Sequence, residues 1–182
     1  MVMARGFEMA DSVTPRARLN PGTRERRRCG RKVLGMAHRT FFSFHYERDV
    51  QRATVVRNSS KLKPSITPEW IEAAIWESAK TTGPAAVQKL IDEALVGTTV
   101  TAVLVGARTS SRRWVKYEIE KSIERGNGLI GIYIHNIKDW AGNTDSKGVN
   151  PLPAGYRTYD WVINNGYNNL GTWVDDAYHA GN

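Results

Sequence analysis

Apolar residues along the chain occur in two kinds of segment. Short continuous runs, rich in β-branched and aromatic residues, predict buried strands. They lie at 40–44, 98–106 and 129–135. Elsewhere apolar residues recur three and four positions apart, which predicts helices that pack on a sheet. These segments are 49–58, 84–95 and 111–125. Strands that alternate with such helices are typical of an α/β domain with a mostly parallel central sheet, flanked by helices on both faces.

Two regions are less regular. Residues 69–78 fit either a helix or a short strand, because their apolar positions satisfy both periods. Beyond about residue 138 a long polar loop precedes a final segment whose apolar residues are enough to dock on the domain but too few to form another. They are Trp161, Val162, Tyr167, Leu170, Trp173 and Val174. We therefore expect 36–182 to form a single domain with a C-terminal extension from about residue 138.

The first 35 residues differ in composition from the rest. They hold nine of the 26 basic residues and three of the 18 acidic ones, so most of the formal net charge of +8 lies there. The segment is rich in arginine, proline and glycine and lacks apolar periodicity, which predicts disorder. Met36 offers a second start, so residues 1–35 are a candidate upstream extension. Because the remainder is nearly balanced in charge, nucleic-acid binding is not favoured.

Several classes of protein fit the sequence poorly. The one cysteine, Cys29, lies in the leader, so the predicted domain has no disulfide and no cysteine nucleophile, which suits a reducing cytoplasm. No apolar stretch approaches the roughly 20 residues of a membrane span. The four histidines lack the spacing of metal ligands. We therefore expect a cytoplasmic protein without a metal and without a membrane anchor.

The segment 126–131, GNGLIG, matches the G-x-G-x-x-G pattern of dinucleotide-binding loops. That loop must follow a strand and open a helix, whereas this segment follows a predicted helix and opens a predicted strand. It is therefore interpreted as a glycine stop that ends the helix at 111–125. Ser110 or Ser111 is expected to cap the start of the same helix.

Glu118 occupies a special position on the predicted helix at 111–125. The core-facing stripe is expected to contain Val115, Ile119 and Ile123. A neighbouring stripe contains Trp114, Glu118, Ser122 and Arg125, within about 40° of each other on a helical wheel. Glu118 therefore borders the core. From the residues alone, a solvated helix carboxylate remains the commoner interpretation.

Ligands of open α/β sheets bind beyond the carboxyl ends of the strands, near the point where the strand order reverses. Three predicted loops should meet there. They are 43–47 after the first strand, 76–84 before the helix at 84–95, and 106–114 after the central strand.

Two long motifs carry a resemblance to a known family. Taken together, RTFFSFHYERD (39–49) and SSRRWVKYEIEKSIERGNGLIGIYI (110–134) resemble the TIR domain, specifically the TIR-like proteins of the ThsB type in bacterial Thoeris anti-phage defence. The general pattern has an ISY-like triplet, a glycine or proline loop, and a serine followed by W-x-x-x-E on a later helix. The corresponding residues are 42–44, 77–84, and Ser110 or Ser111 with Trp114 and Glu118. The resemblance implies a flavodoxin-like TIR fold.

The resemblance also implies an activity. In enzymatic TIR domains the glutamate at the position of Glu118 is essential for cleaving NAD+ between nicotinamide and ribose. ThsB-type proteins close the remaining ADP-ribose into a cyclic isomer, a messenger that activates a separate effector. NAD+ is thus a substrate, and no cofactor is implied. A phage-derived trigger and a homo-oligomeric active form are further expectations.

We expect Glu118 to be the catalytic residue, with a group of further residues around NAD+. The substrate contacts are predicted to be Ser43, Phe44, His45, Tyr46, Glu77 and Trp114. Two other functions stay open at this point. One is a TIR scaffold that acts only by self-association or partner binding, with a structural Glu118. The other is a transferase that processes the N-glycosidic bond of nucleosides.

Overall fold

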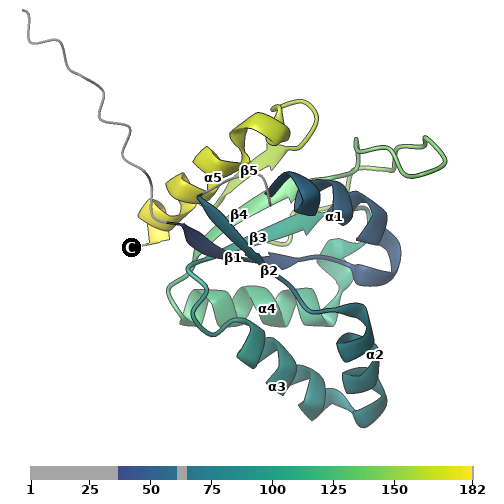
Figure 1. Cartoon of the computed structure of the whole chain (residues 1–182), viewed down its shortest axis with the longest axis vertical. Coiled ribbons are helices and arrows are strands. Elements are labelled where there is room, and N and C mark those ends of the chain that lie inside the picture. The colour runs from purple at the N-terminus through teal and green to yellow at the C-terminus, as the bar shows by residue number, and fades with distance from the viewer. Residues whose placement is uncertain (1–36, 61–64, 182) are drawn as a thin grey trace, which may run out of the picture. The chain divides into compact units, whose positions relative to one another are not determined.

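The computed structural model describes residues 37–60 and 65–181, which contain one sheet whose five strands are all parallel (Figure 1). The strand order is β2-β1-β3-β4-β5. The strands are β1 (His38–Ser43), β2 (Ile66–Glu69), β3 (Val100–Val105), β4 (Gly128–Tyr133) and β5 (Arg157–Asp160). This order belongs to the flavodoxin-like class of doubly wound sheets and confirms the predicted α/β fold.

The central strand β3 lies between β1 and β4, and all six of its residues are buried. Its β-branched residues suit a position covered on both faces. The chain passes from β1 to β2 on one side of the sheet, and β3 then pairs with the other side of β1. The carboxyl ends of β1 and β3 therefore flank the point where the strand order reverses, and Ser43 pairs there with Val103.

Helices cover both faces of the sheet (Figure 1). On one face, α1 (Tyr46–Ser60) and α5 (Gly166–Gly181) pack against residues such as Phe42 and Leu104. On the other face, α4 (Arg113–Glu124) packs against β3 and β4, and α3 (Pro84–Ala94) packs against Phe41. The alternation of neighbouring Phe41 and Phe42 between the two faces follows from the two-residue period of a strand.

The structure resolves the ambiguous segment 69–78 in favour of a helix. Strand β2 ends at Glu69, and α2 (Ala73–Thr82) begins after a short loop. None of the ten residues of α2 is buried, and the helix packs against α3. Gly83, with φ of +123°, separates α2 from α3, and Pro84 opens α3 as predicted.

The predicted start of α4 was wrong, and its predicted end was right. Neither Ser110 nor Ser111 caps α4, because residues Thr109–Ser111 form a separate 3₁₀ turn and the helix begins at Arg113. At the other end, the N–H of Gly126 donates to Ile123 O and that of Asn127 to Ser122 O, which is a Schellman motif with glycine at positive φ.

Some residues that were predicted to face the core are exposed. Ile123 is exposed near the end of α4, and Ser122 takes the buried position. The Ser122 hydroxyl bonds to Thr101 Oγ1 at 2.7 Å and to Glu118 O at 2.7 Å, so a polar contact replaces the expected apolar one. Val162 and Tyr167, which were expected to help dock the final segment on the domain, are exposed as well.

The final segment packs on the sheet as expected. Strand β5 extends the sheet beside β4, and α5 buries Leu170, Trp173 and Val174 against it. Helix α5 passes so close to Gly128 that a Cβ there would lie 2.2 Å from Ala177 O. The stacking of Tyr159 on Trp173, with centroids 4.2 Å apart, joins β5 to α5.

The predicted disordered leader, residues 1–35, lies outside the described residues. Within the described part of the chain, no helix is both long enough and apolar enough to cross a membrane.

Candidate active site

A cavity of about 410 Å³ lies at the carboxyl ends of β1 and β3. Its walls come from the three loops that the sequence predicted to meet: 44–47 after β1, Trp76 and Lys80 on α2, and 111–115 after β3. Glu118, one turn further along α4, completes the lining. This volume lies within the usual range of small-molecule sites. The topology and the loops thus build a pocket where the fold class places ligands.

Glu118 is buried, with 6% of its surface exposed, although it lines the cavity. The Ser43 hydroxyl, at the end of β1, donates a hydrogen bond to Glu118 Oε2. Burial raises the pKa of Glu118 to about 8, and the Ser43 hydrogen bond opposes this shift by stabilising the ionised form. In the free protein the Glu118 carboxyl is therefore mostly neutral at pH 7. A positive charge bound beside it would lower its pKa and favour the ionised form.

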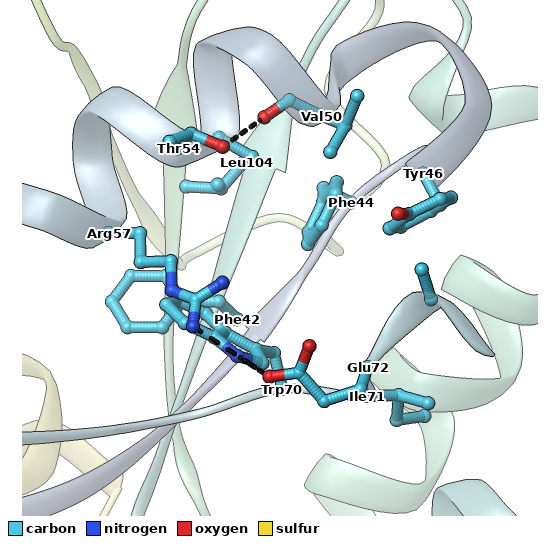
Figure 2. A pocket seen from close by; sticks show the side chains of 12 residues that line it. Phe42, Phe44, Tyr46, Val50, Thr54, Arg57, Trp70, Ile71, Glu72 and Leu104 are labelled. Carbon is cyan, nitrogen blue, oxygen red and sulfur yellow. Dashed lines mark hydrogen bonds and ion pairs between the residues drawn. The ribbon is translucent and has the colours of Figure 1, made fainter. Parts of the chain in front are cut away.

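Phe44 and Tyr46 form a shared wall between this cavity and a smaller apolar slot on the other side of β1. Their ring centroids lie 6.0 Å apart. The slot, about 70 Å³, lies between α1 and the segment after β2. Figure 2 shows Phe44 and Tyr46 at one end of the slot and Trp70, under the Arg57 guanidinium at 3.7 Å, at the other. Phe44 and Tyr46 therefore line both the cavity and the slot.

His45 lies between the two rings in sequence and turns toward the large cavity. It is 8% exposed, and neither ring nitrogen has a hydrogen-bond partner within the described part of the chain. Its Nε2 lies 3.6 Å from Glu47 Oε2, beyond hydrogen-bond range. Burial, and then the charge of Arg112, lower the pKa of His45. The imidazole is therefore neutral at pH 7 and has unused hydrogen-bonding capacity.

Trp114 and Trp76 provide further aromatic surface. Trp114 opens α4, meets Tyr117 edge-to-face at 6.1 Å, and carries the Arg113 guanidinium at 4.5 Å above its ring. Trp76 reaches the cavity from α2, and its ring also packs with the cluster around Phe41. Four aromatic side chains (Phe44, Tyr46, Trp76 and Trp114) therefore line the cavity.

The structure brings most of the predicted site residues together. Phe44, His45, Tyr46, Trp114 and Glu118 line the cavity, and Ser43 contacts Glu118 from behind. Glu77 is the exception: it is exposed on α2, forms an ion pair with Lys80 at 2.9 Å, and does not reach the lining.

Sequence reasoning missed Trp76, Lys80 and Arg112. The loop 76–84 was identified, yet the choice of residue within it depends on the rotation of α2. Once 73–82 is known to be helical, Trp76 and Lys80 lie four positions apart and share a face, while Glu77 is rotated by about 100° from Trp76. The ambiguity between helix and strand in this segment therefore hid which of its residues line the cavity.

Within the described part of the chain, no group of three or more His, Cys, Asp or Glu residues is arranged to hold a metal ion.

The sheet order, with a tryptophan and a buried glutamate on α4 beside its switch point, defines a TIR-like domain. The model of the family described as "Thoeris protein ThsB, TIR-like domain" matches residues 41–139. The chain is similar to "Putative cyclic ADP-D-ribose synthase ThsB1" of Bacillus cereus (strain MSX-D12), with 37% identity over 193 residues. The alignment covers 77% of this chain and 100% of that protein. The chain belongs to the ThsB family of TIR-like Thoeris proteins, which confirms the resemblance seen in the sequence.

The burial of Glu118 predicts a stability effect. Because its folded pKa is raised, its contribution is fully favourable below the unfolded value of about 4.5 and is lost as the pH rises through about 8. Glu118→Gln keeps a hydrogen-bond acceptor for Ser43 and cannot ionise. At pH 7 it should therefore be more stable than the wild type by roughly 3 kcal/mol.

Urea unfolding at pH 7 and at pH 4.5 measures this effect, with the exposed Glu120→Gln on the same helix as control. The gain of Glu118→Gln should fall to about 0.4 kcal/mol at pH 4.5, where the folded wild-type carboxyl is neutral and the unfolded one is half ionised. A destabilised Glu118→Gln at pH 7 would show that the carboxyl is ionised and well solvated in the folded protein.

Proposed function

We propose that this domain cleaves NAD+ between nicotinamide and ribose and closes the ADP-ribose part into a cyclic isomer that serves as a messenger in anti-phage defence. The observation that carries the proposal is the buried Glu118 carboxyl in the wall of a cavity that four aromatic rings line. Membership of the ThsB family and the name of the Bacillus cereus relative support it.

A single carboxyl group suffices for the cleavage step. Nicotinamide leaves the cationic pyridinium as a neutral molecule, so no acid has to protonate it, unlike the leaving group of an ordinary glycoside. The carbon–nitrogen bond breaks with its electron pair on nicotinamide, and positive charge develops on the ribose. An ionised Glu118, held by Ser43 in a site with little water, stabilises that charge.

Substrate binding itself can ionise Glu118. The free carboxyl is mostly neutral at pH 7 because no cation replaces the water that burial removes. The pyridinium of bound NAD+ brings a positive charge next to it and lowers its pKa. The carboxylate therefore forms when the substrate is in place, with release of the proton.

Cyclisation requires that a nucleophile of the same molecule reaches the ribose carbon before water does. An adenine or ribose atom of the ADP-ribose part then bonds to that carbon and loses its proton, with no further reactant. Phe44, Tyr46, Trp76 and Trp114 offer surfaces on which the adenine can stack while the molecule is folded back. Their apolar rings also displace water from the cavity.

The cyclic product would act on a separate effector protein. A phage-derived trigger and assembly into a homo-oligomer belong to the same proposal, since the resemblance implies both for the active form. Cytoplasmic NAD+ would be the substrate pool.

The catalytic role of Glu118 is tested by nicotinamide release from NAD+, with product identity from mass spectrometry. Glu118→Gln should reduce the rate at least about 100-fold, because it removes the charge that stabilises the transition state. Glu120→Gln should retain full activity. Both should be assayed with and without lysate from phage-infected cells as a trigger source. If neither the wild type nor Glu118→Gln releases nicotinamide in any condition, a non-enzymatic scaffold is favoured. Turnover of nucleosides without NAD+ cleavage would favour a transferase.

The pH dependence of kcat/KM provides a second test. Because ionised Glu118 is required and its pKa in the free protein is about 8, kcat/KM should rise with pH up to about 8 and then level off. Ser43→Ala removes the hydrogen bond that favours the ionised form, so this limb should move to higher pH. Ser110→Ala, outside the cavity lining, is the control. A profile that is flat between pH 6 and 9, or unmoved by Ser43→Ala, contradicts this role.

A further inference from the structure

Glu47 lies at the mouth of the cavity and forms ion pairs with basic side chains from two other parts of the fold. Its carboxylate, in the first turn of α1, lies 3.2 Å from Lys80 Nζ of α2 and 3.0 Å from Arg112 Nη2, just before α4. His45 Nε2 approaches it to 3.6 Å. Lys80 and Arg112 hold the pKa of Glu47 below its usual value, so the carboxylate stays ionised. Basic groups from distant parts of the sequence therefore converge on a single acceptor.

The cavity has more positive than negative groups. Its lining includes three cations (Lys80, Arg112 and Arg113), while Glu118 is mostly neutral at pH 7 and leaves Glu47 as the anion among the lining residues. Lys80 also pairs with Glu77, which lies outside the lining. Two negative charges would match this lining better than the single charge that Glu47 supplies.

Further hydrogen-bond donors face the same place without an acceptor. Arg112, the residue before α4, makes no side-chain cap hydrogen bond, and the first N–H groups of any helix lack an intrahelical acceptor, so the start of α4 can bind an anion. The buried imidazole of His45, with neither nitrogen bonded, is an independent sign of a missing ligand. Glu47 pairs with Lys80 and Arg112. Within the described structure it forms no hydrogen bond with His45 or with the start of α4.

Glu47 is also easy to displace. Its side chain is 58% exposed, and exposed ion pairs contribute little because water and salt screen them. A diphosphate would bring several oxygens, including a pair that fits the planar guanidinium of Arg112.

We infer that Lys80, Arg112, His45 and the start of α4 form a binding site for the diphosphate of NAD+, which the Glu47 carboxylate occupies until the substrate displaces it. The inference rests on the proposed function, which names NAD+ as the substrate. Glu47 thus acts as an internal competitor that lowers the affinity of the resting cavity for nucleotides with a diphosphate.

The placement agrees with the position of Glu118. Arg113 and Glu118 are five residues apart on α4, or roughly 7 Å along the helix axis. The nicotinamide-bearing ribose joins the diphosphate directly in NAD+, so a diphosphate at the start of α4 brings this ribose toward the carboxyl group. The aromatic rings of Phe44 and Tyr46 then remain for the adenine.

Binding of ADP-ribose to the full-length protein, measured by calorimetry, tests the site without requiring turnover. Glu47→Gln should tighten ADP-ribose binding about threefold to tenfold, since two exposed ion pairs no longer compete. Arg112→Gln and Lys80→Gln should each weaken it about tenfold or more. Nicotinamide, which lacks phosphate, should bind all variants equally. Glu93→Gln and Lys89→Gln, an exposed ion pair on α3, are matched controls that should change nothing.

A double variant separates competition from other effects. If Glu47 acts by occupying Arg112, the gain from Glu47→Gln should shrink in the Arg112→Gln background. ADP-ribose binding that is unchanged or weaker in Glu47→Gln, or unchanged in both cation variants, overturns the inference, as does a wild type that binds no ADP-ribose at millimolar concentration.

Activity distinguishes this inference from the proposed function. If ADP-ribose binding responds as expected but NAD+ is never cleaved, the anion site stands and the enzymatic proposal fails. If NAD+ is cleaved with the same KM in Glu47→Gln, Lys80→Gln and Arg112→Gln, the enzymatic proposal stands and the diphosphate site is overturned.

Discussion

The site depends on a carboxyl group placed in a position where charge is unfavourable. Glu118 is held between α4 and the end of β1, with Ser43 as its hydrogen-bond donor. A surface glutamate would be ionised, hydrated and free to turn. Burial removes the water, fixes the side chain and raises its pKa to about 8, so the group gains a strong response to any nearby cation. Burying this carboxyl group lowers the free energy of unfolding at pH 7, a cost that is common at active sites.

The sheet explains why this arrangement can be held. β1 and β3 end side by side at the switch point; Ser43 is the last residue of β1, and the segments after the two strands carry residues 44–47 and the start of α4. Helix α4 is fixed along its length by Val115 and Ile119 in the core and by the Ser122–Thr101 hydrogen bond. The position of Glu118 is thus set by rigid elements, whereas the charged groups at the cavity mouth are on exposed side chains. Under the proposed function, a rigidly held Glu118 and exposed charged side chains at the cavity mouth would suit a reaction that admits an anionic substrate and then excludes water.

Sequence patterns could predict the α/β fold, because buried strands and amphipathic helices give strong local signals, and the resemblance carried by the two long motifs singled out Glu118 as a candidate. Three buried strands, the glycine stop after α4 and the two long motifs were readable directly. The burial of Glu118 was not, since a helical wheel placed it at the border of the core and the partner that encloses it, Ser43, is 75 residues away. Trp76 and Arg112 were hidden for a similar reason: the rotation of α2 and the extra 3₁₀ turn before α4 are decided by tertiary packing. Short polar loops and helix ends carry too little pattern to fix such details.

The protonation state of Glu118, on which both its raised pKa and its proposed role depend, can be observed directly. Carbon-13 NMR of glutamate-labelled protein, with the resonance assigned by its loss in Glu118→Gln, follows the carboxyl group as the pH is varied. We expect a titration midpoint near 8 in the free protein and a lower midpoint when a non-cleavable NAD+ analogue with a cationic ring is bound. A midpoint near 4.5 in the free protein, unmoved by the analogue, would mean that Glu118 is an ordinary solvated carboxylate without a raised pKa.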